Sequence, residues 1–425
     1  MSLAREPAAA DVSFVMPCLN EVRSLAPCIA AIRTALDRIG HDYGLSGEIL
    51  VADNGSTDGS QALAVSLGAR VVDVREKGYG AALRGGFAAA RGRYLVMGDA
   101  DGSYDFREAA PMVGALVAGA DLCMGNRFAG GIMLGAMPWK NRYIGNPLLT
   151  GILNLLFKAR VSDAHCGLRA VTRACYDRLQ LAGAGMEFAS EMVIKAALKG
   201  EVIVERPATL SPDLRDRAPH LRPWRDGWRH LRYLFMLSPA WLFALPAALV
   251  GGVGAAILSI AGWHAVFQPG VEIALGDYWV VLAAALVGLG HIAAILALAT
   301  HLHGVRAGYR RPGPWIMRLS RLVTLETMIL IGAILAALGL ADLMWVVAQW
   351  SARAFTRASS VLPAVVGTLL MTLGGQNVLG GFLLAILGGN EARFLGAMPP
   401  ATAARTTADP APSAWTGVTQ PPTLS

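Results

Sequence analysis

The second half of the chain contains four apolar stretches, and these constrain the possible folds more than any other feature. They cover about residues 240–263, 278–300, 323–347 and 361–389. A helix needs about 20 apolar residues to cross the roughly 30 Å hydrocarbon core of a bilayer, so each stretch is long enough to do so. The sequence therefore predicts a membrane domain with four transmembrane helices over residues 237–390.

The charges in the connecting loops predict how these helices are oriented. The connection at 301–321 carries five arginines and no acidic residue, whereas the one at 264–276 carries only Glu272. Positively charged loops are retained in the cytosol, so the first should be cytosolic and the second external. Arg353 and Arg357 on the second outer loop argue weakly against this orientation. We predict a multi-pass protein of the inner or plasma membrane. The sequence also allows a homo-oligomer.

Residues 11–214 show a different pattern, which is typical of a cytosolic α/β domain. Short β-rich runs such as "GEILVADNG" and "RYLVMGD" alternate with helical stretches. This alternation predicts right-handed βαβ units and a parallel sheet. Five scattered cysteines precede the apolar stretches, and we expect them to be small buried side chains in a reducing compartment. No apolar stretch of signal-peptide type precedes this domain.

Three shorter segments complete the predicted organisation. Residues 1–10 are expected to be flexible, and the cytosolic tail at 391–425, rich in Pro, Ala and Thr, to be disordered. Residues 215–236 interleave arginines with Trp224 and Trp228, which suits an amphipathic helix in the lipid headgroup region; an anchor without chemical function is an equally good interpretation. Much of the net charge of +7 lies beside the apolar stretches, so membrane lipids, and not nucleic acid, are the expected partners.

Polar clusters follow the predicted strands at four places. They are residues 18–21, 53–58, 75–80 and 98–105. Ligands of open α/β sheets bind beyond the carboxyl ends of the strands. The four clusters are therefore expected to form one site.

The last of these clusters contains three aspartates. Asp99 and Asp101 are alternate residues of an extended segment, so their carboxylates could reach one Mg²⁺ or Mn²⁺ ion. A helix cap is the alternative interpretation for Asp101. For Asp105 the cap is preferred, because a helical stretch follows at once.

The other clusters indicate a nucleotide. Asp53 ends a strand, where a carboxylate can accept hydrogen bonds from a base or a ribose, while turn formation explains Asn54 and Asp58 equally well. Residues 76–92 place glycines where the chain has to come close to a ligand, ahead of a helix N-terminus that favours anions. The sequence lacks the dinucleotide fingerprint and the phosphate loop, which argues against NAD binding and ATP hydrolysis.

Taken together, the motifs resemble those of a known enzyme family. The segments "PCLNE", "DNGSTDGS", "GYGAALRGGFAAARG" and "GDADGSYD" have the order and spacing of family 2 glycosyltransferases. With "GNRF", "KNRYIGN" and "DAHCGLRA" added, the chain looks like the polyprenyl-phosphate group of that family, which includes dolichyl-phosphate mannose and glucose synthases and bacterial undecaprenyl-phosphate relatives. The resemblance covers roughly residues 11–235. It implies an α/β GT-A domain, which is a Rossmann-like nucleotide-sugar-binding fold, followed by an α-helical transmembrane domain.

The resemblance also implies an activity and site residues. The expected reaction is the metal-dependent, inverting transfer of a sugar from a UDP- or GDP-linked donor to a polyprenyl phosphate at the cytosolic membrane face. The residues expected at the nucleotide sugar are Pro17, Asn20, Glu21, Asp53, Asn54, Lys77, Gly78 and Asp99. Asp99 and Asp101 would hold Mg²⁺ or Mn²⁺, and the catalytic residues would be Asp101, Arg127 and Arg142. The acceptor phosphate and the diphosphate would be bound by Arg127, Arg142, Asn146, Arg169, His220 and Arg222.

Several of these assignments have alternatives. A surface salt bridge would also explain Arg127 and Arg142. Asp163 matches a motif near the active site, and Glu187 and Glu191 lie where sugar-contacting acids occur, although one of them could be an ordinary charge on a helix face.

The chain departs from its relatives directly after Asp101. Relatives often carry Gln or another polar side chain there, whereas this chain has Gly102 and then Ser103. The third metal ligand is therefore open among Ser103, Asp105, His220 and water.

Two other functions compete with this interpretation. A processive polysaccharide synthase should carry a QxxRW motif after the α/β domain, and this sequence has none. A catalytically inactive membrane scaffold is disfavoured because the residues expected to carry the reaction are intact: Asp53, Asp99, Asp101, Arg127 and Arg142.

Overall fold

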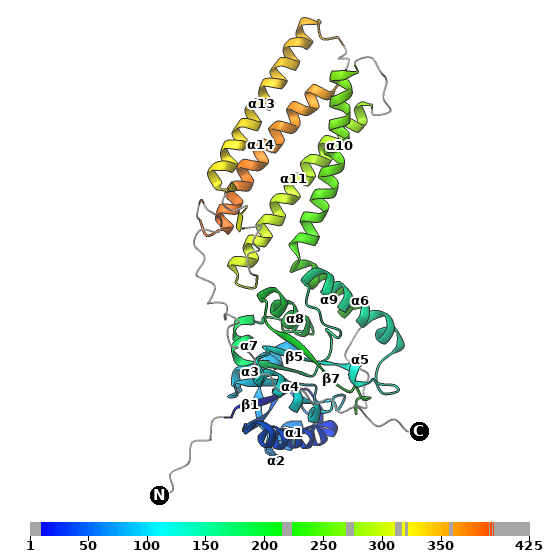
Figure 1. The fold of residues 1–425 in the computed structure, drawn as a ribbon, viewed down its shortest axis with the longest axis vertical. Helices are drawn as coiled ribbons and strands as arrows, with labels where there is room; N and C mark the ends of the chain where they lie inside the picture. The colour runs from blue at the N-terminus through cyan, green and yellow to red at the C-terminus, as the bar shows by residue number, and fades with distance from the viewer. Residues whose placement is uncertain are drawn as a thin grey trace, which may run out of the picture.

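The computed structural model describes residues 10–214, 223–268, 276–310, 317–318, 322–356, 360–390, 392 and 394. An α/β region at one end is joined to a group of long helices at the other (Figure 1). The predictions for the first nine residues, for the tail beyond residue 394, and for His220 and Arg222 lie outside the described residues.

The α/β region, residues 10–214, is built on a seven-stranded sheet with the order β3-β2-β1-β4-β6-β5-β7. The strands are β1 (Val12–Cys18), β2 (Gly47–Asp53), β3 (Arg70–Asp73), β4 (Tyr94–Met97), β5 (Leu122–Asn126), β6 (Arg169–Thr172) and β7 (Ile203–Pro207). Cys18, Asp53 and Asp73 are partners across β1, β2 and β3, so these strands end level at one edge.

The expectation of a wholly parallel sheet is wrong at one strand. β6 runs antiparallel to both of its neighbours, β4 and β5, whereas the other pairings are parallel. An antiparallel pair can be predicted from sequence when a short turn joins the two strands. β6 lies far along the chain from both of its partners, so no such turn signals its direction. The reversal places the start of β6, at Arg169, beside the end of β4, at Met97.

Both faces of the sheet are covered by helices, since successive side chains of a strand point to opposite faces. Phe14 and Met16 pack in a core with α1, α2 and α4, whereas Val15 packs in a second core with α3, α6, α7 and α8. These helices are α1 (Val22–Tyr43), α2 (Ser60–Ser66), α3 (Tyr79–Ala89), α4 (Ala109–Val117), α6 (Asn146–Phe157), α7 (Arg173–Leu179) and α8 (Glu187–Lys199). Short helical turns complete the region: η1 (Phe106–Glu108), α5 (Arg127–Gly130) and the π-helical η2 (Asn141–Gly145).

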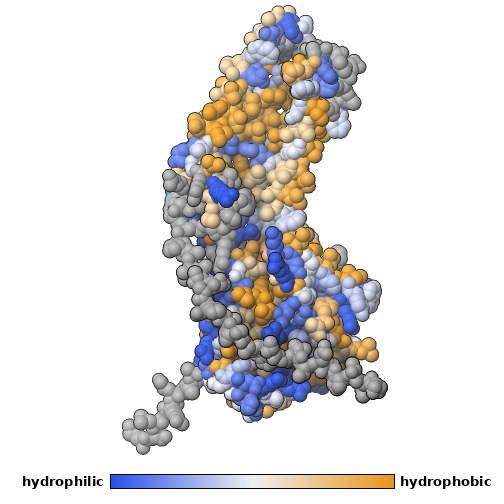
Figure 2. Space-filling model, in the orientation of Figure 1, coloured by the Kyte–Doolittle hydropathy of each residue, from blue (hydrophilic) through white to orange (hydrophobic). Residues whose placement is uncertain are grey.

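The predicted long apolar helices are confirmed. They are η3 (Ala240–Ala244) continuing into α10 (Leu245–Phe267), then α11 (Asp277–Arg306), α13 (Leu325–Ala352) and α14 (Leu362–Leu387). Four helices among the described residues are long and apolar enough to cross a membrane. Their packing follows a row, because α10 lies on α11, α11 on α14, and α14 on α13 (Figure 1). Apolar side chains cover much of the visible surface of this row, whereas the α/β region is mixed (Figure 2).

Two polar residues of α14 face neighbouring helices of the row. Oε1 of Gln376 on α14 accepts a hydrogen bond of 2.8 Å from Nδ1 of His291 on α11. Asn377 lies beside Gly332 of α13. These contacts fit a structural role for both residues.

Helix α9 (Pro223–Met236) joins the two parts of the molecule. It packs against α6 and α8, and Leu234 and Leu237 are buried in the second core of the α/β region. Arg310, just beyond α11, donates a hydrogen bond of 2.6 Å to the carbonyl of Leu237. The start of the arginine-bearing connection therefore lies on the same side of the helix row as the α/β region.

All five cysteines are free and buried, as expected from the sequence.

Candidate active site

The loops after β1 and β2 are fastened to each other. Asn20 has a positive φ of 58°, and its Oδ1 accepts a hydrogen bond of 2.8 Å from the Thr57 amide. The Asn20 amide in turn donates to Ser56 Oγ at 2.9 Å. Asp58 also links the two loops, since it accepts hydrogen bonds from the Val22 amide at the start of α1 and from Ser60 Oγ at the start of α2. The two strand ends therefore form one edge, as the spacing predicted.

Asp53 lies at the end of β2 with its carboxylate oriented by its own loop. It accepts hydrogen bonds from the amides of Gly55 and Ser56 and from Nε2 of Gln61, the last at 2.6 Å. Burial would raise the pKa of Asp53, but the hydrogen bonds from Ser56 and Gln61 hold it below its usual value. The side chain is thus a fixed carboxylate. Its expected contact with a base remains a prediction.

Asn54 connects this loop to the next one. Its amide donates to the carbonyls of Val74 and Glu76 at 2.9 and 2.7 Å, and its Oδ1 accepts from the Gly78 amide at 2.9 Å. Lys77 Nζ donates to the Asn54 carbonyl at 2.6 Å. Both donors of the amide are used, which favours a positioning role for Asn54, and its expected contact with the nucleotide sugar remains a prediction.

The glycines around α3 have close protein neighbours. A Cβ on Gly78, which has a φ of +135°, would lie 2.2 Å from the Ala184 carbonyl, and one on Gly80 would lie 2.3 Å from the Gly183 carbonyl. These positions need glycine because the loop before α8 crosses the start of α3. We expected the glycines to make room for a ligand, and the structure gives them this packing role. Pro17 in β1 and the buried Glu21 at the start of α1 line the neighbouring strand end.

Asp99 follows β4 and lies between two other elements. The Tyr79 hydroxyl at the start of α3 hydrogen-bonds to its carboxylate, and burial together with that charge raises the pKa of Tyr79. On the other side, a Cβ on Gly167 would be 2.7 Å from Asp99 Oδ2, so the chain before β6 passes directly over the carboxylate.

Asp101 is buried two residues further on. Its Oδ1 accepts hydrogen bonds from the Ser103 amide at 2.9 Å and from Ser103 Oγ at 2.6 Å. Gly102 between them has a φ of +79°, and a Cβ there would meet Leu214 Cδ1 at 2.8 Å. The backbone thus explains the glycine at the position where relatives carry a polar side chain.

The carboxylates of Asp99 and Asp101 fit a hard divalent metal that is shared with a ligand. Within the described part of the chain, no group of three His, Cys, Asp or Glu side chains could hold a metal ion. Mg²⁺ and Mn²⁺ accept one or two carboxylates when substrate phosphates and water complete the shell. Asp105 does not belong to this pair, because its Oδ1 caps η1 by accepting from the Arg107 amide at 2.9 Å, which agrees with the preferred interpretation.

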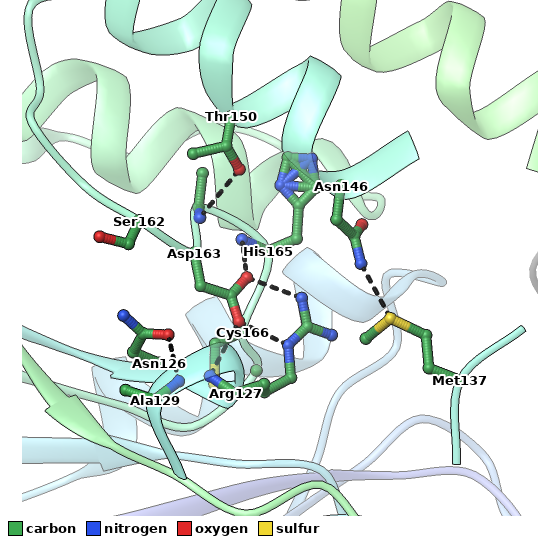
Figure 3. A network of polar contacts seen from close by, with 12 residues as sticks. Asn126, Arg127, Ala129, Met137, Asn146, Thr150, Ser162, Asp163, His165 and Cys166 are labelled. Carbon is green, nitrogen blue, oxygen red and sulfur yellow. Dashed lines mark hydrogen bonds and ion pairs between the residues drawn. The ribbon is translucent and has the colours of Figure 1, made fainter. Parts of the chain in front are cut away.

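Arg127 and Asp163 form a buried ion pair in the second half of the site (Figure 3). Nε and Nη2 of Arg127 donate to the two Asp163 oxygens, each at 2.7 Å, and the Arg127 amide donates to the same carboxylate. Burial would lower the pKa of Arg127, but neighbouring Tyr104 and Asp163 raise it. Arg127 is therefore a fixed cation whose Nη1 makes no hydrogen bond to a described residue.

Arg142 lies on η2, and Asn146, at the start of α6, lies near this pair in Figure 3. Arg142 is half-buried, stacks over the Tyr143 ring and forms no ion pair with any acid that the structure describes. The Asn146 amide contacts Met137 Sδ at 3.3 Å, and its side chain points toward the Arg127 guanidinium in Figure 3. The ion pair of Arg127 is thus buried and is not the surface salt bridge of the alternative, and Arg142 forms no salt bridge with a described residue.

Arg169 is fully buried at the start of β6. Its guanidinium donates to the carbonyls of Cys166, Ala164 and Ala189. A side chain enclosed in this way holds the loop before β6 in shape and has no surface to offer a phosphate. The expected phosphate contact of Arg169 is therefore corrected to a positioning role.

Glu187 and Glu191 hold the loop that precedes α8. Glu187 accepts a hydrogen bond from the Gly185 amide, while buried Glu191 accepts from the Gly183 amide and pairs with Lys195 at 2.7 Å. The contacts of Glu191 match the structural alternative for an acid on a helix face. The loop that they hold is the one that crosses α3.

A single loop joins the two halves of the site. Asp163 contacts Arg127, and Gly167 contacts Asp99, with only four residue steps between them. Four residues of extended chain span at most about 14 Å, so the carboxylates and the Arg127 cation belong to one site.

Sequence reasoning missed three residues of this site. Tyr79 contacts Asp99, and the Tyr104 hydroxyl accepts a hydrogen bond of 2.9 Å from the Gly167 amide. His165 lies within the loop itself. The motifs "GYG", "GSYD" and "DAHCGLRA" contain all three, so their motif membership was the available signal.

Two family models match this chain. Glycosyl transferase family 2 matches residues 13–179, which include the strand ends described above. The glycosyltransferase family 2 C-terminal transmembrane region matches residues 298–388, which include α13 and α14.

Similar proteins extend the match over most of the chain. The low-salt glycan biosynthesis hexosyltransferase Agl6 of Haloferax volcanii is 35% identical over 386 residues, covering 89% of this chain and 90% of Agl6. Polyprenol monophosphomannose synthase of Mycolicibacterium smegmatis is 29% identical over 210 residues, covering 46% of this chain and 76% of that protein.

A solved structure is also similar in part. Glucosyl-3-phosphoglycerate synthase from Mycobacterium tuberculosis, in complex with Mn²⁺, UDP and phosphoglyceric acid, is 25% identical, with a TM-score of 0.40 over 54% of this chain and 78% of that one. The α/β sheet followed by four apolar helices agrees with a GT-A domain and a transmembrane region. The protein is a membrane glycosyltransferase, and the chain belongs to family 2, in the group that matches the polyprenyl-phosphate glycosyltransferases.

Proposed function

We propose that this enzyme transfers a hexose from a nucleotide-diphosphate sugar, linked to UDP or GDP, to the phosphate of a membrane polyprenol such as undecaprenyl or dolichyl phosphate. The product is a polyprenyl-monophosphate-linked sugar. Relatives with this kind of activity include a polyprenol monophosphomannose synthase and a dolichyl-phosphate hexose transferase. The contacts described above support the proposal in three steps.

The donor occupies the edge formed by the ends of β1, β2 and β4. Asp53 is a fixed carboxylate there and suits a base or ribose, and the exposed Lys77 lies on the adjoining loop. Asp99 and Asp101 would hold Mg²⁺ or Mn²⁺, which would supply Lewis-acid stabilisation to the leaving diphosphate. The pair itself provides two hard oxygen ligands and leaves the remaining positions to the diphosphate and water.

The acceptor phosphate lies on the side of Arg127 and Arg142. Arg127 presents Nη1 toward it while Asp163 holds the other edge of the guanidinium, and planar guanidinium groups suit phosphate oxygens. Arg142 has no acidic partner among the described residues, so its charge is available to an anion. Around it, η2, α6 and the residues just before η2 expose large apolar side chains: Trp139, Tyr143, Ile144, Leu148 and Leu155.

These apolar side chains bring the acceptor site to the bilayer. Tyr143 is 67% exposed and Leu148 58% exposed, which is unusual for side chains in water but ordinary in the headgroup region. Trp228 on α9, which packs against α6, is also exposed. A polyprenyl tail in the bilayer would leave its phosphate at this surface. By the loop charges, the surface faces the cytosol.

The reaction needs no dedicated general base. An acceptor hydroxyl would have to lose a proton, but a phosphate monoester has a second pKa of about 6 and is already an anionic nucleophile near neutral pH. One phosphate oxygen forms a bond to the anomeric carbon, while the bond from that carbon to the diphosphate oxygen breaks and the nucleoside diphosphate leaves. In-line displacement inverts the anomeric carbon. The arginines reduce the repulsion between the two anions.

The observation that carries this proposal is the loop from Asp163 to Gly167. It holds the phosphate-facing cation at one end and passes over the metal-facing carboxylate at the other. A site built in this way suits a reaction between a metal-bound diphosphate and a second phosphate.

Membranes containing the protein test the proposal directly. They are incubated with labelled UDP- and GDP-sugars and undecaprenyl or dolichyl phosphate, with Mg²⁺, Mn²⁺ or a chelator. We expect label from one donor in the lipid extract, dependent on the metal and on added acceptor. No lipid-extractable label from any donor would overturn the proposal. Label in a high-molecular-weight polymer would instead indicate a processive synthase, and unchanged cellular function of Asp101→Ala would indicate a scaffold.

A further inference from the structure

His165 carries two buried polar atoms that the fold leaves without a partner. It lies in the loop between Asp163 and Gly167, and neither Nδ1 nor Nε2 makes a hydrogen bond. An imidazole always has at least one N–H donor, and a buried donor without an acceptor costs free energy. Such a group in a native protein calls for a reason, and a ligand is one of the recognised reasons.

The surroundings of the ring point to an anionic ligand. Figure 3 shows the His165 ring beside the Asn146 side chain, while the Arg127 guanidinium lies next to the Asp163 carboxylate of the same loop. Nη1 of Arg127 has no hydrogen-bond partner among the described residues, whereas Asp163 occupies its other edge. Polar side chains from the end of β5, the loop and α6 therefore gather around the segment from Asp163 to His165.

The ring is neutral in this environment. Burial, then the neighbouring Arg127 and His230, lower the pKa of His165 to about 3, with Asp163 opposing them. A neutral imidazole donates one N–H and can satisfy it on an anion without adding a proton to the site. A ligand oxygen beside the ring would supply the acceptor that the buried N–H lacks.

A second histidine beside it already has a partner. The His230 ring on α9 lies 5.6 Å from the His165 ring, and its Nδ1 is 3.0 Å from Ser190 Oγ on α8. The two rings are thus alike in burial and position but differ in hydrogen bonding, which makes His230 a matched control.

We infer that His165 binds the acceptor phosphate together with Arg127 and Asn146, donating one ring N–H to a phosphate oxygen. The inference rests on the proposed function for the identity of that phosphate. The acceptor, and not the donor diphosphate, is the expected partner because His165 lies at the Arg127 end of the loop, whereas Asp99 and Asp101 lie at the other end.

The test compares His165→Phe, which keeps a ring but removes the donor, with His165→Gln, which restores an N–H. Farnesyl phosphate serves as the acceptor, because its short tail limits the contribution of membrane partitioning. We expect His165→Phe to raise the KM for farnesyl phosphate about tenfold, which corresponds to one hydrogen bond to a charged group. The KM for the nucleotide sugar should change less than twofold, and His165→Gln should recover part of the loss.

A binding measurement without donor keeps the inference separate from the proposed function. Farnesyl phosphate should raise the Tm of the wild-type protein, and His165→Phe should lose most of that shift while His230→Phe keeps it. Equal shifts for wild type and His165→Phe, or no shift for wild type, overturn the inference whether or not transfer is detected. It is also overturned if His230→Phe loses as much as His165→Phe, because the rings would then act by packing, or if only the KM for the donor rises.

Discussion

The two halves of this enzyme are held together by opposite means. In the α/β region, the site depends on charged and polar side chains that cross between loops, as in the pair of Arg127 and Asp163. In the helix row, close contact depends on positions that have no side chain. A Cβ on Gly332 would lie 2.7 Å from the Gly374 carbonyl, and one on Gly339 would lie 2.6 Å from the Gly367 carbonyl.

This difference follows from the surroundings of each half. Between apolar helices in lipid there is little hydrophobic gain from burying a side chain, so close backbone approach supplies the packing. In the α/β region water is the competitor, and a buried charge has to be paired to be tolerated. Substitutions in the α/β region should therefore affect activity and charge pairing. Substitutions in the helix row should affect how closely the helices pack.

The largest effect is expected at the metal-facing pair. Asp101→Asn keeps an acceptor for Ser103 but loses the charge that we propose holds the cation, so transfer to lipid should fall at least about a thousandfold, as for the removal of a group that stabilises the leaving anion. Initial rates of lipid-linked label at saturating Mn²⁺ measure it. Asp105→Asn, which alters only the cap of η1, should retain the rate within a few-fold. Comparable losses in both variants would refute the separation of these aspartates.

The next largest effect concerns the buried ion pair. Asp163→Ala leaves the Arg127 charge buried and unpaired, and we expect a loss of about 3–5 kcal/mol in the free energy of unfolding of the α/β region. Chemical denaturation of the full chain in detergent, followed by fluorescence, measures it.

A double variant separates charge from packing at this pair. Arg127→Met with Asp163→Leu removes both charges and should recover more than half of the lost stability, although it is inactive. If Asp163→Ala is as stable as the wild type, then the pair does not organise the region.

In the helix row, a smaller effect is expected from a single methyl group. A Cβ on Gly374 would lie 2.6 Å from the Gly332 carbonyl, whereas the space around Gly375 is open to 4 Å. Gly374→Ala should cost about 1–3 kcal/mol, as overpacking does, and Gly375→Ala should be close to neutral. Thermal unfolding in lipid nanodiscs compares them, and equal Tm values would mean that α13 and α14 do not touch as described.

The smallest effect is expected for the hydrogen bond between α11 and α14. Gln376→Leu removes the partner of His291 and should cost about 0.6 kcal/mol, and not more than roughly 1.7 kcal/mol. Thr372→Val, which removes only a bond to Thr368 within α14, is the control and should cost less. A loss from Gln376→Leu larger than that from Gly374→Ala would reverse the comparison between packing and polar contacts in this half.

Much of the fold could be predicted from local patterns. Strand ends rich in Asp, Asn and Gly gave the position of the site, because parallel strands end at one edge. Asp105 could be recognised as a cap from the helical stretch that follows it. The four long helices followed from apolar length alone.

The parts that could not be predicted depend on partners that are distant in the sequence. Asp163 lies 36 positions from Arg127 in the sequence. No local pattern therefore indicates that Arg127, which was expected to bind a phosphate, is paired with an acid. The buried state of Arg169 and the reversal of β6 are likewise set by pairing across the sheet. For Gly78 and Gly80, the sequence predicted a close approach to a ligand. The actual neighbour is a loop about a hundred residues later in the chain, which no local pattern indicates.

The row arrangement of the helices has a consequence for how the protein is made. The tightest neighbours, α10 with α11 and α13 with α14, are also consecutive in the chain. Each pair can therefore form a hairpin as it leaves the ribosome, before the other exists. The contact of α11 with α14, where His291 meets Gln376, has to wait until synthesis of the last helix. The helices can thus assemble in the order in which they are translated. In the final step the two hairpins pack against each other, after synthesis of the catalytic domain.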